Sequence, residues 1–126
     1  MALILIVEDA WFTRRLISKT LQAAGHTTVE ASCGREGLEK ALTHAPDCIL
    51  LDLLMPDLDG REVLQKLRDQ ESRMPAIVLT ADIQSSSRQQ CLDLGAIAVL
   101  GKPPNPQELA AAIDQAIAAK VGGITP

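Results

Sequence analysis

The sequence predicts an α/β fold in which five parallel strands alternate with five helices. Short apolar runs of four or five residues recur along a chain of 126 residues. Between these runs lie longer segments in which apolar residues follow the helical period of 3.6. This alternation is typical of successive βαβ units, and the length suits one domain with one core.

The predicted strands differ in how far apolar residues fill them. Four runs are apolar throughout, as expected for parallel strands covered by helices on both faces, whereas residues 27–31 alternate and carry Glu30. This run is therefore predicted to lie nearer an edge of the sheet. The five predicted strands are 3–7, 27–31, 48–51, 76–79 and 97–100.

Helical periodicity is clear in four of the intervening segments and weak in one. The stripes cover residues 16–24, 38–45, 63–67 and 109–121, and the weaker pattern covers 83–96. Pro106 suits the first turn of the last helix. Gly25 and Gly95 are predicted to end the first and fourth helices.

Composition excludes several classes of function. Twelve Lys and Arg against sixteen Asp and Glu give a net charge of -4, and no basic cluster exceeds Arg14-Arg15, so no nucleic-acid surface is expected. Cys33, Cys48 and Cys91 have neither disulfide nor zinc spacing. The apolar run near the N-terminus is too short for a membrane span, so we expect a soluble intracellular protein.

Polar residues stand at the carboxyl ends of four predicted strands. Glu8 and Asp9 follow the first, Asp52 the third, Thr80 the fourth and Lys102 the fifth. In an open parallel sheet these ends meet at one edge, so the side chains are predicted to converge in one crevice. Three carboxylates repel one another at reduced dielectric, and the cluster therefore predicts a hard divalent cation, with Mg²⁺ the natural candidate.

Simpler interpretations exist for single members of this set. Asp9 is equally compatible with capping the first helix, although capping leaves Glu8 unexplained. A lone Thr80 or Lys102 would usually be structural or solvated, so the prediction rests on their joint placement. Asp57 and Asp59 are expected to form a turn and the start of the third helix, outside the site.

The motifs resemble, over essentially the whole chain, the receiver domain of two-component response regulators, the chemotaxis-regulator-like fold. One motif alone would be weak evidence, but the ordered set is highly specific. The matching residues, in the family's order and spacing, are Glu8-Asp9, Asp52 to Pro56, Gly60, Thr80-Ala81, Gly95-Ala96 and Lys102-Pro103.

The resemblance implies a flavodoxin-like, doubly wound sheet with strand order 2-1-3-4-5, spanning residues 1–121. Residues 122–126 would be a tail or the start of a linker. In this fold Asp52 would accept a phosphoryl group from a phosphohistidine, and Thr80 and Lys102 would contact its oxygens. A cis peptide bond before Pro103 is also implied.

The resemblance further implies a magnesium site and a set of partners. The donor would be a histidine kinase or a histidine phosphotransfer protein, and the output would pass to a downstream protein or a fused effector domain, in the cytoplasm. Such a domain takes part in its own phosphorylation and autodephosphorylation but is not an enzyme. The implied Mg²⁺ ligands are Asp9, Asp52 and the backbone carbonyl of Leu54, with Glu8 acting largely through water.

Some positions depart from the family's pattern. Val99 replaces the usual aromatic residue three positions before Lys102, and Pro104 stands where Phe is common, so we expect a muted or different readout. Leu54 and Asp82 border the path of hydrolytic water, and the apolar Leu54 predicts slow autodephosphorylation. Trp11 is either a partly exposed packing residue or a contact for the phosphodonor.

Other functions fit the residues less well. A hydrolase of the haloacid dehalogenase type would carry a second Asp where Leu54 stands. A nucleotide or flavin binder would carry a Gly-rich or Ser/Thr-rich loop where Glu8-Asp9 stands. The better alternative is a degenerate receiver that serves as a docking module without phosphorylation, although every site residue is in place.

Overall fold

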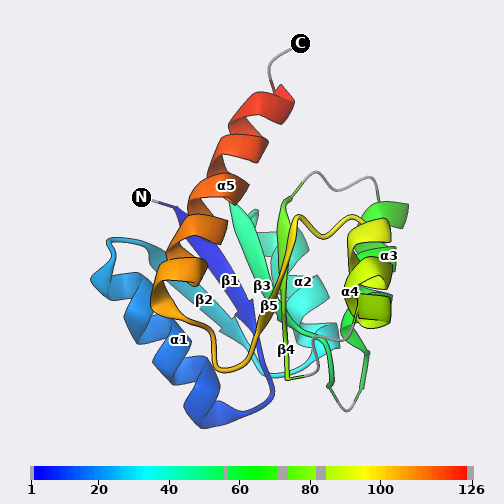
Figure 1. Cartoon of the computed structure of the whole chain (residues 1–126), viewed down its shortest axis with the longest axis horizontal. Helices are drawn as coiled ribbons and strands as arrows, with labels where there is room; N and C mark the ends of the chain where they lie inside the picture. Colours follow the sequence, from blue (N-terminus) through cyan, green and yellow to red (C-terminus); the bar gives the residue numbers. More distant parts are fainter. Residues whose placement is uncertain (1, 56, 71–73, 82–84, 125–126) are drawn as a thin grey trace.

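The structure is a computed structural model that describes residues 2–55, 57–70, 74–81 and 85–124. It is a five-stranded parallel sheet in the order β2-β1-β3-β4-β5, with five helices in the connections, and this confirms the predicted fold class and strand order (Figure 1). The elements are β1 (Leu3–Val7), α1 (Trp11–Ala23), β2 (Thr27–Ala31), α2 (Gly34–His44), β3 (Cys48–Asp52), α3 (Gly60–Asp69), β4 (Ala76–Thr80), α4 (Ser85–Asp93), β5 (Ala98–Gly101) and α5 (Pro106–Ile124).

Helices cover both faces of the sheet, α1 and α5 on one and α2, α3 and α4 on the other (Figure 1). Alternate residues along each central strand serve the two layers, because successive strand side chains point to opposite faces. Leu50 of β3, for example, packs in the layer of α1 and α5, whereas Ile49 packs in the layer of α3. The central strands are thus buried on both sides.

The residues of the two edge strands are less buried than those of the three central strands. β2 lies at one edge, as its alternating sequence predicts, and only Ala31 in it is fully buried. β5 lies at the other edge, and its four residues are all half-buried. This apolar run is covered on both faces as predicted, but only in part, because an edge position leaves some of it open: Ala98 and Leu100 pack against one layer and Val99 against the other.

Several element boundaries differ from the predicted ones. β3 and β4 each extend one residue further, to Asp52 and Thr80, and β5 begins one residue later, at Ala98. α5 continues to Ile124, three residues past the predicted end at 121. The glycines at 122 and 123 disfavour a helix by about 1 kcal/mol each relative to Ala, which is not enough to stop one.

The turn-forming residues act as the sequence predicts. Gly25 and Gly95 follow α1 and α4 with φ of 95° and 105°, a left-handed backbone that glycine adopts without strain. Pro106 opens α5. Among the described residues, none of the helices has the length and apolar character needed to cross a bilayer.

Candidate functional site

The carboxyl ends of the strands bring the predicted polar residues to one edge of the sheet. Glu8 follows β1 directly, Asp52 and Thr80 end β3 and β4, and all three side chains are buried, with 1–4% of their surface exposed. Asp9, next to Glu8, is exposed. Because the strands are parallel and adjacent, these groups lie at the same edge of the sheet, the lower edge in Figure 1.

Three carboxylates lie close together at this edge of the sheet, and we call them the acidic cluster. One oxygen from each of Glu8, Asp9 and Asp52 lies within 4.8 Å of the other two. Two of the residues are buried and the third is open to solvent, so an ion has both a concentrated negative charge and a route of entry. Carboxylate oxygens are the ligands that Mg²⁺ prefers, and the donor set therefore fits the ion.

Lys102 completes the cluster from the end of β5. Its ammonium group forms an ion pair with Oε1 of Glu8 and lies 3.4 Å from Oδ2 of Asp52. The Lys102 N–H donates to the carbonyl of Thr80 at 2.9 Å, which ties the turn after β5 to the end of β4. The peptide bond between Lys102 and Pro103 is cis, as the resemblance implies.

Burial and pairing give the three charged groups different ionisation. Burial is the main cause that raises the pKa of Asp52 to about 7, and the adjacent Glu8 raises it further, while Lys102 acts in the opposite direction. Burial is the largest single influence on the pKa of Glu8 and would raise it, but hydrogen bonds with Lys102, Asp52, Ala10 and Asp9 together outweigh burial, and the pKa is lowered. For Lys102, burial opposes the charge, yet the two carboxylates raise its pKa.

The loop after β3 is held by its own backbone. The N–H of Leu54 donates to Oδ1 of Asp52 at 3.4 Å, and the N–H of Gly60 donates to the carbonyl of Leu53 at 2.8 Å. Leu53 is buried, whereas the side chain of Leu54 is 61% exposed. The loop therefore places Leu54 beside the acidic cluster with its side chain outside.

The two later acids of the loop lie outside the cluster and cap helices. Asp59 caps α3 and accepts a hydrogen bond from the N–H of Arg61 at 2.7 Å, as predicted. Asp57 instead accepts from the N–H groups of Gly34 and Arg35, both at 2.9 Å, at the start of α2. These bonds lower the pKa of Asp57, the bond from Arg35 being the largest cause. The sequence predicts Asp57 in a turn and outside the site; its bonds to α2 add to that prediction, because the fold brings the α2 N-terminus to this loop.

Helix capping does not account for Asp9. The residue at the N-cap of α1 is Ala10, and no side chain caps this end of the helix. The alternative in which Asp9 serves only as a cap is therefore excluded. Its carboxylate remains available to the acidic cluster.

The structure describes two further positions that the sequence singles out. Val99 is half-buried in β5 and packs against the layer formed by α3 and α4. Trp11 opens α1 and is 66% exposed, in agreement with the expectation of a partly exposed residue. Asp82 lies outside the described residues.

Sequence reasoning missed the contacts that hold the turn between β1 and α1. Arg14 donates to the backbone carbonyl of Glu8, and its guanidinium also pairs with Glu30. The sequence pattern marks Glu30 only as a residue of an edge strand. One signal was present, namely a basic residue within the first two turns of the helix that follows the acidic pair.

Comparison with known proteins agrees with this geometry. The family model of the response regulator receiver domain matches residues 4–114, and the chain belongs to this family of two-component signalling proteins. Its solved relatives include the chemotaxis protein CheY4 of Vibrio cholerae, which is 34% identical, with a TM-score of 0.86 over 92% of this chain and 98% of that one. A receiver domain from Clostridium thermocellum is 28% identical, with a TM-score of 0.92 over 98% of this chain and 100% of that one.

Two of the similar proteins are named as transcriptional regulatory proteins. The alkaline phosphatase synthesis regulatory protein PhoP of Bacillus subtilis is 38% identical over 110 residues, which are 87% of this chain and 46% of that protein. The KDP operon regulatory protein KdpE of Escherichia coli is 41% identical over 114 residues, which are 90% of this chain and 50% of that protein. The chain thus spans about half the length of these relatives.

Proposed function

We propose that the chain is a phosphorylation-dependent receiver in which Asp52 accepts a phosphoryl group from a phosphohistidine donor. The observation that carries the proposal is the contact of one buried carboxylate, Asp52, with both an ammonium group and two further carboxylates. Family membership gives the same expectation. This arrangement suits a nucleophile whose product is a more highly charged acyl phosphate.

In the proposed transfer, an Asp52 carboxylate oxygen attacks phosphorus and the P–N bond of the phosphohistidine breaks. The bonding electrons leave with the imidazole nitrogen, so that the acyl phosphate forms without a protein base. Lys102 is placed to neutralise charge on the transferring oxygens, and the hydroxyl of Thr80, at the end of the neighbouring strand, is assigned to the same oxygens.

Asp9, Asp52 and the carbonyl of Leu54 are the residues that would hold Mg²⁺, with Glu8 acting through water. A bound Mg²⁺ would supply further charge neutralisation at the phosphoryl oxygens. Glu8 and Lys102 already pair, so Glu8 also keeps the ammonium group at the acidic cluster. Asp9, the exposed member, provides the side from which the ion enters.

For the donor, a histidine kinase or histidine phosphotransfer protein, we propose contact at the start of α1. Trp11 and Phe12 are 66% and 70% exposed there, and Leu16 is 52% exposed. Phe12 and Leu16 also line a groove of about 330 Å³ together with Pro103 and Pro104. Large apolar side chains of this kind dominate the energy of many interfaces.

The readout would reach a downstream protein or a fused effector domain. With Val99 in place of an aromatic residue, we propose a signal on the face of α4, β5 and α5 that needs no aromatic rotamer change. Three free cysteines suit the reducing cytoplasm, where we place the protein. No direct contact with nucleic acid or membrane is proposed for this domain.

Incubation with acetyl phosphate and Mg²⁺ tests the function. We expect phosphate incorporation, together with a change in Trp11 fluorescence, in the wild type and neither in Asp52→Asn. Equal incorporation in the variant would exclude Asp52 as the acceptor. No incorporation in a folded wild type would favour the phosphorylation-independent docking module.

A further inference from the structure

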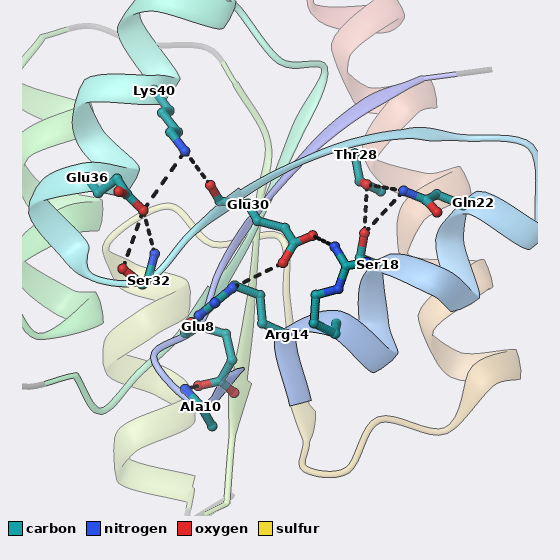
Figure 2. Close-up of polar contacts among 11 residues, drawn as sticks. Glu8, Ala10, Arg14, Ser18, Gln22, Thr28, Glu30, Ser32, Glu36 and Lys40 are labelled. Atoms are coloured by element: carbon teal, nitrogen blue, oxygen red, sulfur yellow. Dashed lines mark hydrogen bonds and ion pairs between the residues drawn. The ribbon is translucent and has the colours of Figure 1, made fainter. Parts of the chain in front are cut away.

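Arg14 joins the start of α1 to the residue that follows β1. Its Nη1 donates to the backbone carbonyl of Glu8 at 2.8 Å, and its Nε donates to Oε1 of Glu30 at 3.1 Å (Figure 2). The side chain is only 13% exposed, unlike the neighbouring Arg15, which is 47% exposed. The guanidinium thus lies between a strand-end carbonyl and a carboxylate, using two of its fixed donor directions.

Glu30 is itself held at both ends. Its second oxygen, Oε2, accepts from Nη1 of Arg15 at 2.7 Å, and its backbone carbonyl accepts from Nζ of Lys40 at 2.6 Å. Lys40 also lies 3.9 Å from the carboxylate of Glu36 on the same helix. Glu30 is therefore tied to α1 through its carboxylate and to α2 through its backbone carbonyl (Figure 2).

The carbonyl that Arg14 binds belongs to a member of the acidic cluster. The N–H of Glu8 donates to the carbonyl of Ala31 at 3.1 Å, so the main chain of Glu8 is held by β2 on one side and by Arg14 on the other. Its side chain accepts from the N–H of Ala10 at 3.2 Å and pairs with Lys102. A rotation of the peptide between Glu8 and Asp9 would move both carboxylates relative to Asp52.

We propose that Arg14 is a positioning residue for the divalent-cation site and that Glu30 acts through Arg14 by orienting its guanidinium. This inference rests on the proposed function, because it assumes that the acidic cluster binds Mg²⁺. The simpler alternative is an ordinary ion pair near the surface, which contributes little to stability. The hydrogen bond from Arg14 to the Glu8 carbonyl distinguishes the positioning role from an ordinary ion pair, because an ion pair with Glu30 alone would not involve this carbonyl.

The test measures binding of Mn²⁺, which favours the same oxygen ligands, by the electron paramagnetic resonance signal of the free ion, with Mg²⁺ as competitor. Loss of a group that orients a metal ligand typically weakens binding about 10- to 100-fold, so we expect Arg14→Ala to weaken it about tenfold. Arg14→Lys keeps the positive charge but lacks the planar guanidinium with its several N–H donors, so we expect Mn²⁺ affinity between those of the wild type and Arg14→Ala. Lys19→Ala is the matched control, since Lys19 is an exposed cation of the same helix, and its affinity should stay at the wild-type value.

Glu30→Thr tests the second half of the proposal. Thr suits a strand but is too short to orient Arg14, so we expect weaker Mn²⁺ binding than in the wild type. The double variant Arg14→Ala with Glu30→Thr should bind no more weakly than Arg14→Ala alone, because Glu30 acts through Arg14. If the two substitutions weaken Mn²⁺ binding additively, Glu30 does not act through Arg14 and this half of the proposal is overturned.

Urea unfolding without metal separates positioning from general stability. A lowered midpoint in Arg14→Ala with unchanged Mn²⁺ affinity of the folded protein would overturn the proposal while leaving the proposed function intact. Failure of the wild type to bind Mn²⁺, with binding equally absent in Asp52→Asn, would overturn the proposal and the metal site together. Weaker binding in Arg14→Ala but not in Lys19→Ala would support it.

Discussion

Lys102 and Asp52 lie with Nζ and Oδ2 3.4 Å apart, at the ends of strands that are not neighbours in the sheet. The same ammonium group pairs with Glu8, so one cation serves two buried carboxylates. The pKa of Asp52 is raised to about 7, mainly by burial, and Lys102 opposes this rise only in part. Asp52 therefore has little compensation for its own charge before a metal ion or phosphoryl group is bound.

Removing this ammonium group should slow phosphoryl transfer strongly. We expect Lys102→Ala to reduce the rate of phosphorylation by acetyl phosphate by about 100-fold, the usual effect of deleting one preorganised group that stabilises developing charge. Lys66→Ala, which removes an exposed lysine of α3, is the control and should react at the wild-type rate. A wild-type rate in Lys102→Ala would contradict the role assigned to this residue.

The raised pKa of Asp52 makes cation binding depend on pH near neutrality. Below about 7 the carboxyl is protonated and is a poor ligand, so the apparent Mg²⁺ affinity should rise from pH 6 to pH 8 and then level off. Asp52→Asn, which cannot titrate, should bind weakly with a flatter pH dependence. If the Mg²⁺ affinity depends equally steeply on pH in the wild type and in Asp52→Asn, a group other than Asp52 is responsible for the titration.

The Asp52 carboxyl also makes the free energy of unfolding depend on pH when no metal is bound, and in the opposite direction to the metal affinity. The folded-state pKa lies above the ordinary value of 3.8, so between about pH 4 and pH 7 the folded state holds a proton that the unfolded state has lost. Stability due to this group therefore falls as pH rises through that interval. Urea unfolding in the presence of a chelator, wild type minus Asp52→Asn, should show this decline.

Leu54 should lengthen the lifetime of the phosphorylated state. An Asn at this position adds a hydrogen-bonding group beside the path of hydrolytic water, and a hydrogen bond worth about 1 kcal/mol corresponds to about a fivefold faster reaction. The decay of labelled phosphoprotein measures this lifetime in Leu54→Asn. Leu42→Asn is a close control, because Leu42 is also 61% exposed and lies on α2. Equal lifetimes in the wild type and Leu54→Asn would refute the prediction.

Gly60 is required where the loop after β3 enters α3. A Cβ at this position would lie 2.8 Å from the carbonyl oxygen of Asp52 and 2.9 Å from Cα of Leu53, and backbone atoms cannot move aside as a flexible side chain can. We expect Gly60→Ala to lower the free energy of unfolding by about 1–3 kcal/mol. Urea unfolding measures it, with the exposed Glu62→Ala in the same helix as the control. An unchanged midpoint would mean that the loop shifts without cost.

Local patterns were enough to predict the element order and the residues at the strand ends. Strands 3–7 and 27–31 agree with β1 and β2 to the residue, because alternation and apolar runs report local burial. The strand order required the family resemblance, since periodicity does not say which strands pair. Predicted boundaries failed mainly where polar residues end the strands, at Asp52 and Thr80, because the ladder continues past the apolar run.

Contacts between distant segments were decided only by the tertiary structure. The sequence by itself specifies that Asp52 ends an apolar strand, but its raised pKa depends on burial and on Glu8, which arrives from another strand. In the same way, Asp57 caps a helix 22 or more residues earlier in the chain, and Arg14 meets Glu30 only after β2 pairs with β1. Hydrogen bonds and ion pairs depend on distances of a few ångströms, and such distances between remote residues are set by packing rather than by spacing along the chain.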